Sequence, residues 1–384
     1  MSLKKVIRKF HLVLGLTSGL LIFIVSITGC LYVFQEEIFQ TTHKKMVEVV
    51  PRKTGCLSLT ELWASAQRSL GSRNPVNSAG IYTDPSKSWS FSSIDINPKG
   101  STYFSYYKNF QTVYINPYTG QCTGRINYKF EFFNIIKSIH QSMLLANNAG
   151  HQLVGWATLC FVFMALTGLA LWWPGNRRAL RQRLTIRRNT RWRRFNYDLH
   201  YVPGFYALLF SLVIAVTGLM WSFSWANKTI RWFATGNTER RFILPPPSSQ
   251  GFAVTGVLDI ALHETKTRFP HAGSYTTSGI PGDPRGAIWV GVRMSRNSYS
   301  QTNSLYFDRY SGKLLAADFY RNHSLGERLL SMQYDFHVGS IGGIPTKILA
   351  CIVSLVCASL PITGLLILIG RRNKRRHGVR LTPG

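Results

Sequence analysis

The stretch that decides the fold runs from His11 to Gly29 and reads HLVLGLTSGLLIFIVSITG. It contains no Asp, Glu, Lys or Arg, and the apolar run that it belongs to continues to Phe34. About 20 such residues, each rising about 1.5 Å along a helix, cross the roughly 30 Å hydrocarbon core of a bilayer. A lone strand would leave its backbone groups unpaired in lipid. The stretch therefore predicts a membrane-spanning helix.

Three more runs of this kind follow, at 153–173, 202–223 and 348–369. Of the 384 residues, 45% are hydrophobic and only 16% are charged, so the apolar residues are concentrated in these runs. This pattern excludes an ordinary soluble enzyme, a disordered basic tail and a small secreted disulfide protein. We predict an α-helical membrane protein with four transmembrane helices.

The basic residues predict the orientation. The chain has 45 Lys and Arg against 16 Asp and Glu, a formal net charge of +29. Four basic residues precede the first run, nine arginines lie between the second and third, and six basic residues follow the fourth. Short basic segments stay on the cytoplasmic side and contact anionic lipid. We expect both termini and the 174–200 loop inside, and residues 35–150 and 224–344 outside. The loop lacks a base-reading module, so we expect no nucleic-acid partner.

A cleaved signal peptide is the alternative to a membrane anchor for the first run. Ile27-Thr-Gly-Cys30 resembles a lipoprotein cleavage box, but the apolar run is too long for a signal core. We therefore expect a retained anchor.

The six cysteines show no CxxC or Cys/His finger spacing, so a zinc or iron–sulfur site is not expected. Four of them lie within the apolar runs, where small core residues are expected: Cys30, Cys160, Cys351 and Cys357. Cys56 and Cys122 share the first outer segment, and whether they pair is left open.

The landmarks of the first half of the chain recur in the second. His11 lies 17 residues before Thr28-Gly29, and the stretch HYVPGFYALLFSLVIAVTG places His200 17 residues before Thr217-Gly218. His140 precedes Thr167 by 27 residues, and His337 precedes Thr363 by 26. The agreement predicts an internal duplication.

The outer segments also match one another. Ser58-Leu-Thr-Glu61 is a capping-box pattern that predicts a helix over 62–70, and 257–269 has the apolar spacing of another helix. Residues 113–120 and 305–312 each predict a hairpin turn, with Asn116 or Asp308 and a glycine. Each outer segment is thus predicted to be a small α+β module. The expected order is span 1–34, module 35–139, span 140–173, loop 174–199, span 200–223, module 224–336, span 337–370 and tail 371–384.

The repeated His-x3-Gly…Thr-Gly spans, the Thr167-Gly-Leu-Ala-Leu-Trp-Trp-Pro174 exit and the paired hairpins resemble the PepSY-associated transmembrane family. The resemblance covers nearly the whole chain. Its architecture is similar to that of the inner-membrane ferric-siderophore reductases, which hold two haems between four helices. The resemblance implies PepSY-like outer modules and the cytoplasmic (inner) membrane of a bacterium, with the large segments in the periplasm.

Four histidines at the span ends are the candidate ligands. His11 and His200 open the first and third spans on the inner side, and His140 and His337 precede the second and fourth on the outer side. The duplication pairs them across the halves, and two facing imidazoles satisfy the axial positions of a b-type haem. No CxxCH motif occurs, so two non-covalent haems b are expected. The alternative is that these histidines cap helix ends or meet headgroups.

The 33 residues from His140 to Trp173 are too many for one straight helix confined to the membrane. A straight helix over 33 residues measures about 50 Å, beyond the hydrocarbon thickness. Either the helix protrudes or it breaks, and 147–150 and 342–345 are candidate breaks. His151, three turns after His140 in a continuous helix, is the second candidate for the outer site. Lys347 stands in the corresponding region of the second half. The Thr-Gly pairs are interpreted as helix-packing contacts rather than haem contacts.

The leading hypothesis is a membrane oxidoreductase that passes electrons between an inner donor, which the sequence does not identify, and an outer acceptor. The resemblance implies that the acceptor is a ferric chelate (a ferric siderophore), reduced to release Fe(II). The alternatives are a cofactor-free anchor whose modules bind a peptide or protein, and a permease.

Overall fold

A computed structural model describes residues 2–146, 148–239, 243–252, 254–280, 282–295 and 299–379. The chain divides into two compact units. The helical unit comprises the chain up to Val33, Ile136–Asn227 and the chain from Phe336. The sheet unit comprises Phe34–Ile135 and Lys228–Asp335.

Four helices of the helical unit are long and apolar enough to cross a membrane. They are α1 (Leu3–Val33), α7 (Asn148–Trp172), α9 (Trp192–Ser222) and α14 (Ile344–Val379), the last as far as Arg371. Each matches one of the four predicted apolar runs to within one residue at its end, so the four predicted apolar helices are present as candidate membrane spans.

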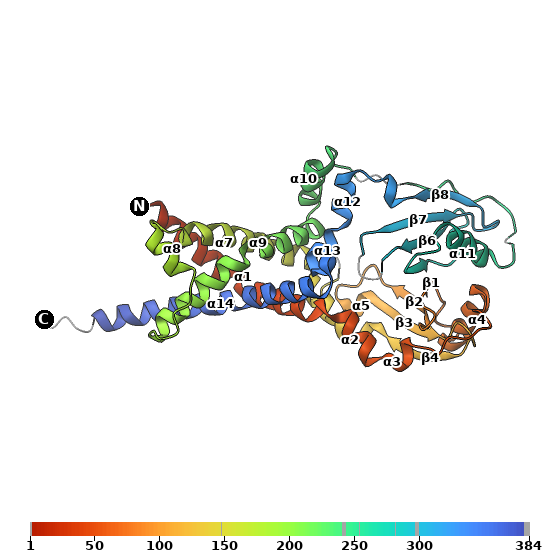
Figure 1. The fold of residues 1–384 in the computed structure, drawn as a ribbon, viewed down its shortest axis with the longest axis horizontal. Helices are drawn as coiled ribbons and strands as arrows, with labels where there is room; N and C mark the ends of the chain where they lie inside the picture. Colours follow the sequence, from red (N-terminus) through yellow and green to blue (C-terminus); the bar gives the residue numbers. More distant parts are fainter. Residues whose placement is uncertain are drawn as a thin grey trace. The chain divides into compact units, whose positions relative to one another are not determined.

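The four helices pack as a ring. α1 contacts α7 and α14, and α9 contacts the same two helices (Figure 1). α1 and α9 are therefore diagonal to one another. Large apolar side chains point away from the ring: Leu20 is 72% exposed and Leu209 is 69% exposed. An apolar outer surface of this kind is suited to lipid.

Both of the predicted long helices break. α6 (Phe132–Ser142) ends before α7 begins, and Met143 and Leu144 between them have φ of 52° and 61°. α13 (Gln333–Val338) and the 3₁₀ turn η3 (Ser340–Gly342) precede α14, with Gly339 and Gly343 at positive φ. The first break thus comes slightly before the predicted 147–150, of which Asn147 lies outside the described residues.

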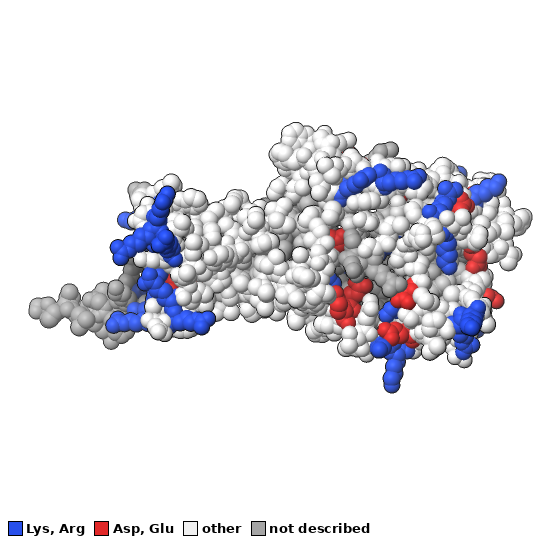
Figure 2. All heavy atoms as spheres, in the orientation of Figure 1, with Lys and Arg blue, Asp and Glu red and all other residues white. Residues whose placement is uncertain are grey.

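Basic side chains gather at one end of the ring. Figure 2 shows Lys and Arg around the N-terminal end of α1 and around α8 (Arg177–Arg183), which follows α7. The Asn176 side chain caps α8 by accepting from the Ala179 N–H at 2.8 Å. Of the predicted basic tail, residues 380–384 lie outside the described residues.

The sheet unit is built on one antiparallel sheet of eight strands in the order β4-β3-β2-β1-β5-β6-β7-β8. The strands are β1 (Ser78–Tyr82), β2 (Trp89–Ile96), β3 (Tyr107–Ile115), β4 (Cys122–Asn127), β5 (Ser274–Thr277), β6 (Ile288–Arg293), β7 (Thr302–Phe307) and β8 (Leu314–Asp318). β1 pairs with β5, with Gly80 opposite Thr276. The two predicted modules therefore share one sheet, which their separate hairpins did not predict.

Two helices, α4 (Leu59–Leu70) and α11 (Val257–Arg268), supply the sheet's apolar core. Leu62, Ile81 and Leu305 are fully buried there, and alternate strand residues face the core. The predicted capping box of α4 is present, with Ser58 and Glu61 bonded reciprocally. The remaining elements are α2 (Gln35–Thr42), α3 (Lys44–Val47), α5 (Tyr103–Tyr106), η1 (Tyr128–Phe130), α10 (Ser224–Thr235), η2 (Tyr320–Asn322) and α12 (Leu325–Ser331).

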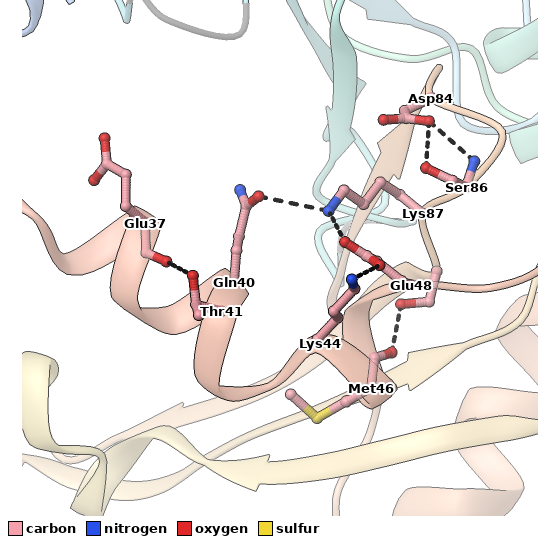
Figure 3. Close-up of polar contacts among 10 residues, drawn as sticks. Glu37, Gln40, Thr41, Lys44, Met46, Glu48, Asp84, Ser86 and Lys87 are labelled. Atoms are coloured by element: carbon pink, nitrogen blue, oxygen red, sulfur yellow. Dashed lines mark hydrogen bonds and ion pairs between the residues drawn. The ribbon is translucent and has the colours of Figure 1, made fainter. Parts of the chain in front are cut away.

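The helices α2 and α3, which follow α1, are bonded to the loop between β1 and β2 (Figure 3). The Lys87 ammonium lies 3.5 Å from Oε1 of Glu48 and donates to Gln40 at 3.5 Å. The Ser88 hydroxyl donates to the carbonyl of Met46 at 2.8 Å. The ion pair is only half-buried and contributes little free energy. The attachment also includes the buried hydroxyl bond, the packing of Met46, and two backbone hydrogen bonds, from the Val49 N–H to Ser86 and from the Ser88 N–H to Val47.

The two predicted hairpin turns are present, with Gly120 at φ 69° and Gly312 at φ 70°. In the first turn, the Asn116 side chain accepts from the Tyr118 N–H at 2.9 Å. In the second, the Asp308 carboxylate accepts from the backbone N–H groups of Tyr310 and Ser249 at 2.9 and 2.5 Å. Burial raises the pKa of Asp308, but these amide bonds outweigh it and hold that pKa well below its ordinary value.

We expect Asp308 to make the second hairpin sensitive to acid. A depressed native pKa gives stability that is complete above the unfolded value, about 3.9, and is lost as the pH falls below it. Hydrogen exchange of the 305–312 segment, corrected for intrinsic rates, should accelerate between pH 5 and pH 3 in the wild type. Asp308→Asn, which copies the neutral Asn116 turn, should show a much smaller pH effect. Equal pH dependence in both proteins would contradict this.

Candidate histidine site

His140 lies on the Thr28-Gly29 pair of α1. Its ring Nδ1 is 2.8 Å from the carbonyl oxygen of Val25 and 3.2 Å from the Thr28 hydroxyl oxygen. A Cβ placed on Gly29 would come within 2.9 Å of the ring Cε1, closer than real Cβ atoms approach. Only glycine therefore leaves room for this ring.

His337 makes the same contacts with α9. Its Nδ1 lies 3.0 Å from the carbonyl oxygen of Ile214 and 3.0 Å from the Thr217 hydroxyl oxygen. A Cβ on Gly218 would lie 3.3 Å from the ring Cε1. The Trp221 ring packs edge-on against the imidazole, with centroids 4.9 Å apart.

His11 and His200 repeat the arrangement in the remaining two helices. His11 Nδ1 lies 3.0 Å from the Thr167 hydroxyl oxygen, and His200 Nδ1 lies 2.9 Å from that of Thr363. The neighbouring glycines, Gly168 and Gly364, lie under the ring carbons, with ideal Cβ positions 3.4 Å from Cε1.

These bonds define the tautomer of the rings. The Thr28 hydroxyl donates to the carbonyl of Ile24 at 2.7 Å, so its oxygen is an acceptor toward His140. The Val25 carbonyl can only accept. Nδ1 of His140 therefore carries the proton, and Nε2 keeps its lone pair. A ring N–H held by a backbone carbonyl, with the other nitrogen bare, is the usual state of a metal-ligating histidine.

The structure brings His140 and His337 together. Their ring centroids are 6.0 Å apart and the rings are inclined at 72°. Bonds of about 2.0 Å from a metal ion to two opposed imidazole nitrogens would separate the ring centroids by roughly 6 Å. The spacing therefore suits two axial ligands on one ion. His11 and His200 lie on the diagonal helices α1 and α9.

The structure does not bring His151 to this site. It is exposed in the first turn of α7. The break after Ser142, with Met143 and Leu144 at positive φ, removes the continuous helix on which His140 and His151 would have shared a face. Lys347, in the corresponding region of the second half, is 9% exposed. Cys56 and Cys122, whose pairing the sequence left open, are exposed free thiols.

Within the described ranges, no three His, Cys, Asp or Glu side chains gather where they could hold a metal ion. Axial ligation of a haem needs only two, because the porphyrin supplies the other four donors. One buried donor near this region is unused: Trp172, five residues after Thr167, is 4% exposed and its indole N–H has no partner among the described residues. Such an N–H is suited to donate a hydrogen bond to an anionic neighbour.

The interpretation of the Thr-Gly pairs as helix-packing contacts was incomplete. All four threonines meet a histidine Nδ1 and all four glycines lie beneath a ring. The signal was already in the sequence, because every predicted ligand histidine had a Thr-Gly pair at a similar position in the neighbouring span.

A family described as the PepSY-associated TM region matches residues 8–371, and the chain therefore belongs to this family. A comparison with curated proteins gives no match.

Gly29 provides a test of this packing that needs no ligand. Gly29→Ala forces its Cβ onto the His140 ring and should destabilise the protein by about 1–3 kcal/mol, as overpacking does. The matched change on the same helix, Gly15→Ala, meets only the sulfur of Met164 at 3.5 Å, an ordinary contact. It should be neutral or slightly stabilising.

Thermal unfolding in detergent, followed by intrinsic tryptophan fluorescence, measures both variants. A Gly29→Ala protein as stable as Gly15→Ala would show that the ring is not seated on Gly29.

Proposed function

We propose that this member of the PepSY-associated TM family carries electrons across the bacterial inner membrane through two b-type haems and reduces a ferric chelate on the outer side. The observation that carries the proposal is the set of four imidazoles, each with Nδ1 within hydrogen-bond distance of a threonine hydroxyl oxygen. In His140 and His337 the same nitrogen also lies 2.8 and 3.0 Å from a backbone carbonyl oxygen. The 6.0 Å separation of the His140 and His337 rings supports it further.

His140 and His337 would ligate the outer haem, and His11 and His200 the inner one. The backbone and threonine bonds hold each ring in place, fix its tautomer and increase the basicity of Nε2. Thr217, for example, prevents rotation of the His337 ring about its Cβ–Cγ bond. When bound, the haem iron supplies one-electron redox chemistry that no side chain here can supply.

An internal duplication accounts for the repetition of these contacts. In the first half, His140 docks on the Thr-Gly pair of α1 and His11 on that of α7. In the second half, His337 docks on the pair of α9 and His200 on that of α14. Each haem would then take one ligand from each half. This explains why the ligands lie on diagonal rather than adjacent helices of the ring.

The indole N–H of Trp172 is a candidate partner for a haem carboxylate at the inner site. It lies in the last turn of α7, whose carbonyls are met by Arg183. A buried N–H donor and a nearby guanidinium both favour an anionic group over a neutral one.

The charge distribution supports the orientation. The basic end of the ring, with the N-terminus and α8, would face the cytoplasm (Figure 2). The sheet unit would then lie in the periplasm, with both termini inside. The outer segments keep an excess of basic residues, which favours an anionic ferric chelate such as a siderophore complex. One electron from the outer haem would convert its Fe(III) to the more weakly held Fe(II); the inner electron donor is not specified.

The alternative from a different class is a cofactor-free membrane anchor whose sheet binds a peptide. It is favoured by the edge strands β4 and β8, each paired on one side only. This alternative gives no reason for the rings of His140 and His337 to lie 6.0 Å apart.

The spectrum of the purified protein tests the proposal. Protein from haem-sufficient cells in mild detergent should show low-spin b-type bands when reduced with dithionite, with two haems per chain by pyridine haemochrome. His140→Ala or His337→Ala should leave one haem, and His11→Ala or His200→Ala should leave the other. Two histidines outside the proposed sites serve as controls: His151, exposed in α7, and His43, which directly follows α2 in the sheet unit. His151→Ala and His43→Ala should keep both haems.

A colourless, folded wild type would favour the cofactor-free anchor. Loss of both haems, or of neither, in all four ligand variants would contradict the pairing.

Reduction of the chelate is tested separately. Dithionite-reduced protein, freed of excess reductant, should be reoxidised by an anionic ferric chelate, with Fe(II) captured by a ferrous indicator. His140→Ala should slow this reoxidation by more than about tenfold, whereas His43→Ala should not change it. A haem-loaded protein that no ferric chelate reoxidises would retain the electron carrier and reject this acceptor.

A further inference from the structure

Two thiols from opposite halves of the chain meet inside the helical unit. The Sγ atoms of Cys30, on α1, and Cys351, on α14, lie 2.6 Å apart. Both side chains are half-buried, and both are free thiols in the structure. α14 carries a second cysteine, Cys357, which is buried and lies six residues after Cys351.

A disulfide requires Cα atoms within about 7 Å and Cβ vectors that converge. An Sγ–Sγ distance of 2.6 Å shows that the side chains of Cys30 and Cys351 already converge. α1 and α14 are neighbours in the ring, so no helix has to move far to close the bond. We propose that Cys30 and Cys351 form a disulfide that joins the two halves of the helical unit.

The position of the pair makes oxidation feasible. Cys30 lies in the last turn of α1, three residues before Val33, where the chain enters the sheet unit. Cys351 lies two turns from the start of α14 at Ile344. Cys30 is thus near the C-terminal end of α1 and Cys351 near the N-terminal end of α14. Because the two helices pack together, both cysteines lie toward one end of the ring rather than at the middle of the span. In the proposed orientation this end faces the periplasm, an oxidising compartment.

The chemistry balances with a protein disulfide as oxidant. One thiolate attacks the oxidant's disulfide to form a mixed disulfide, and the second thiolate displaces it. Each cysteine loses one proton and one electron, the Sγ–Sγ bond forms, and the oxidant leaves as a dithiol. No metal or haem takes part, so this proposal does not depend on the proposed function beyond the orientation.

The disulfide would lie beside the histidine site and restrain the helices that form it. Cys30 follows Gly29, on which the His140 ring rests, and α14 follows the segment that carries His337. Joining α1 to α14 would therefore resist separation of the two elements that present these rings. Residues 30 and 351 enclose most of the chain, and a long closed loop restricts the unfolded chain strongly.

The 184–191 segment, between α8 and α9, permits a direct test. A specific protease site inserted there lets the intact, membrane-embedded chain be cut into two halves. Cys30, Cys56, Cys122 and Cys160 fall in the first half, and Cys351 and Cys357 in the second. Membranes are collected in N-ethylmaleimide, to prevent later oxidation, then cut and run on a denaturing gel without reductant.

The wild type should run as one species near 43.5 kDa and separate into halves only with dithiothreitol. Cys30→Ser and Cys351→Ser should separate without reductant. The matched controls Cys160→Ser and Cys357→Ser, from the same two halves, should behave as the wild type.

A wild type that separates without reductant overturns the proposal. So does a link between the halves that persists in Cys30→Ser or is lost in Cys357→Ser. The gel is denaturing, so a variant that folds poorly still reports its covalent connection. Cys30→Ala is a second variant at the same position and should give the same result as Cys30→Ser.

Discussion

The helical unit is organised around one contact made four times: a histidine Nδ1 within hydrogen-bond distance of the threonine hydroxyl of a Thr-Gly pair. A polar ring among apolar helices is costly unless its N–H has an acceptor. The threonine already bonds to its own helix, as Thr217 does to Val213 and Ile214 at 2.8 Å. Its hydroxyl proton is therefore already used, and its oxygen can accept a hydrogen bond from the imidazole N–H. The glycine removes the Cβ that would keep the ring at a distance.

This constraint explains the broken helices. His140 must reach Gly29, near the Val33 end of α1, so it cannot continue the axis of α7. The chain instead turns through Met143 and Leu144 at positive φ, a conformation that is unfavourable for these residue types. In the second half, glycines at 339 and 343 make the corresponding turn with less strain. The non-glycine turn persists because the ring contacts and packing around it specify its position.

The sequence predicted what depends on local pattern. The four membrane helices follow from apolar length, the capping box from Ser58 and Glu61, and the hairpin turns from Asn116, Asp308 and the two glycines. It also singled out four histidines by their repeated spacing, and the structure places each of them on a Thr-Gly pair, whereas their haem ligation stays a prediction. It did not predict the β1–β5 pairing, since Gly80 and Thr276 are nearly 200 residues apart and carry no signal for one another. The role of the Thr-Gly pairs was missed for a related reason: small residues in a membrane helix suit both helix packing and a ring contact.

The two units of the protein share a further property. In the sheet unit, the first four strands and the last four meet only through β1 and β5, and without that pairing each set would present an extra open edge. In the helical unit, α1 of the first half packs on α14 of the second, and α7 on α9. Each half of the chain thus lacks a partner that the other half supplies, in both units. The proposed haem site, with His140 from one half and His337 from the other, would exist only when the halves are assembled, and haem binding would then stabilise that assembly.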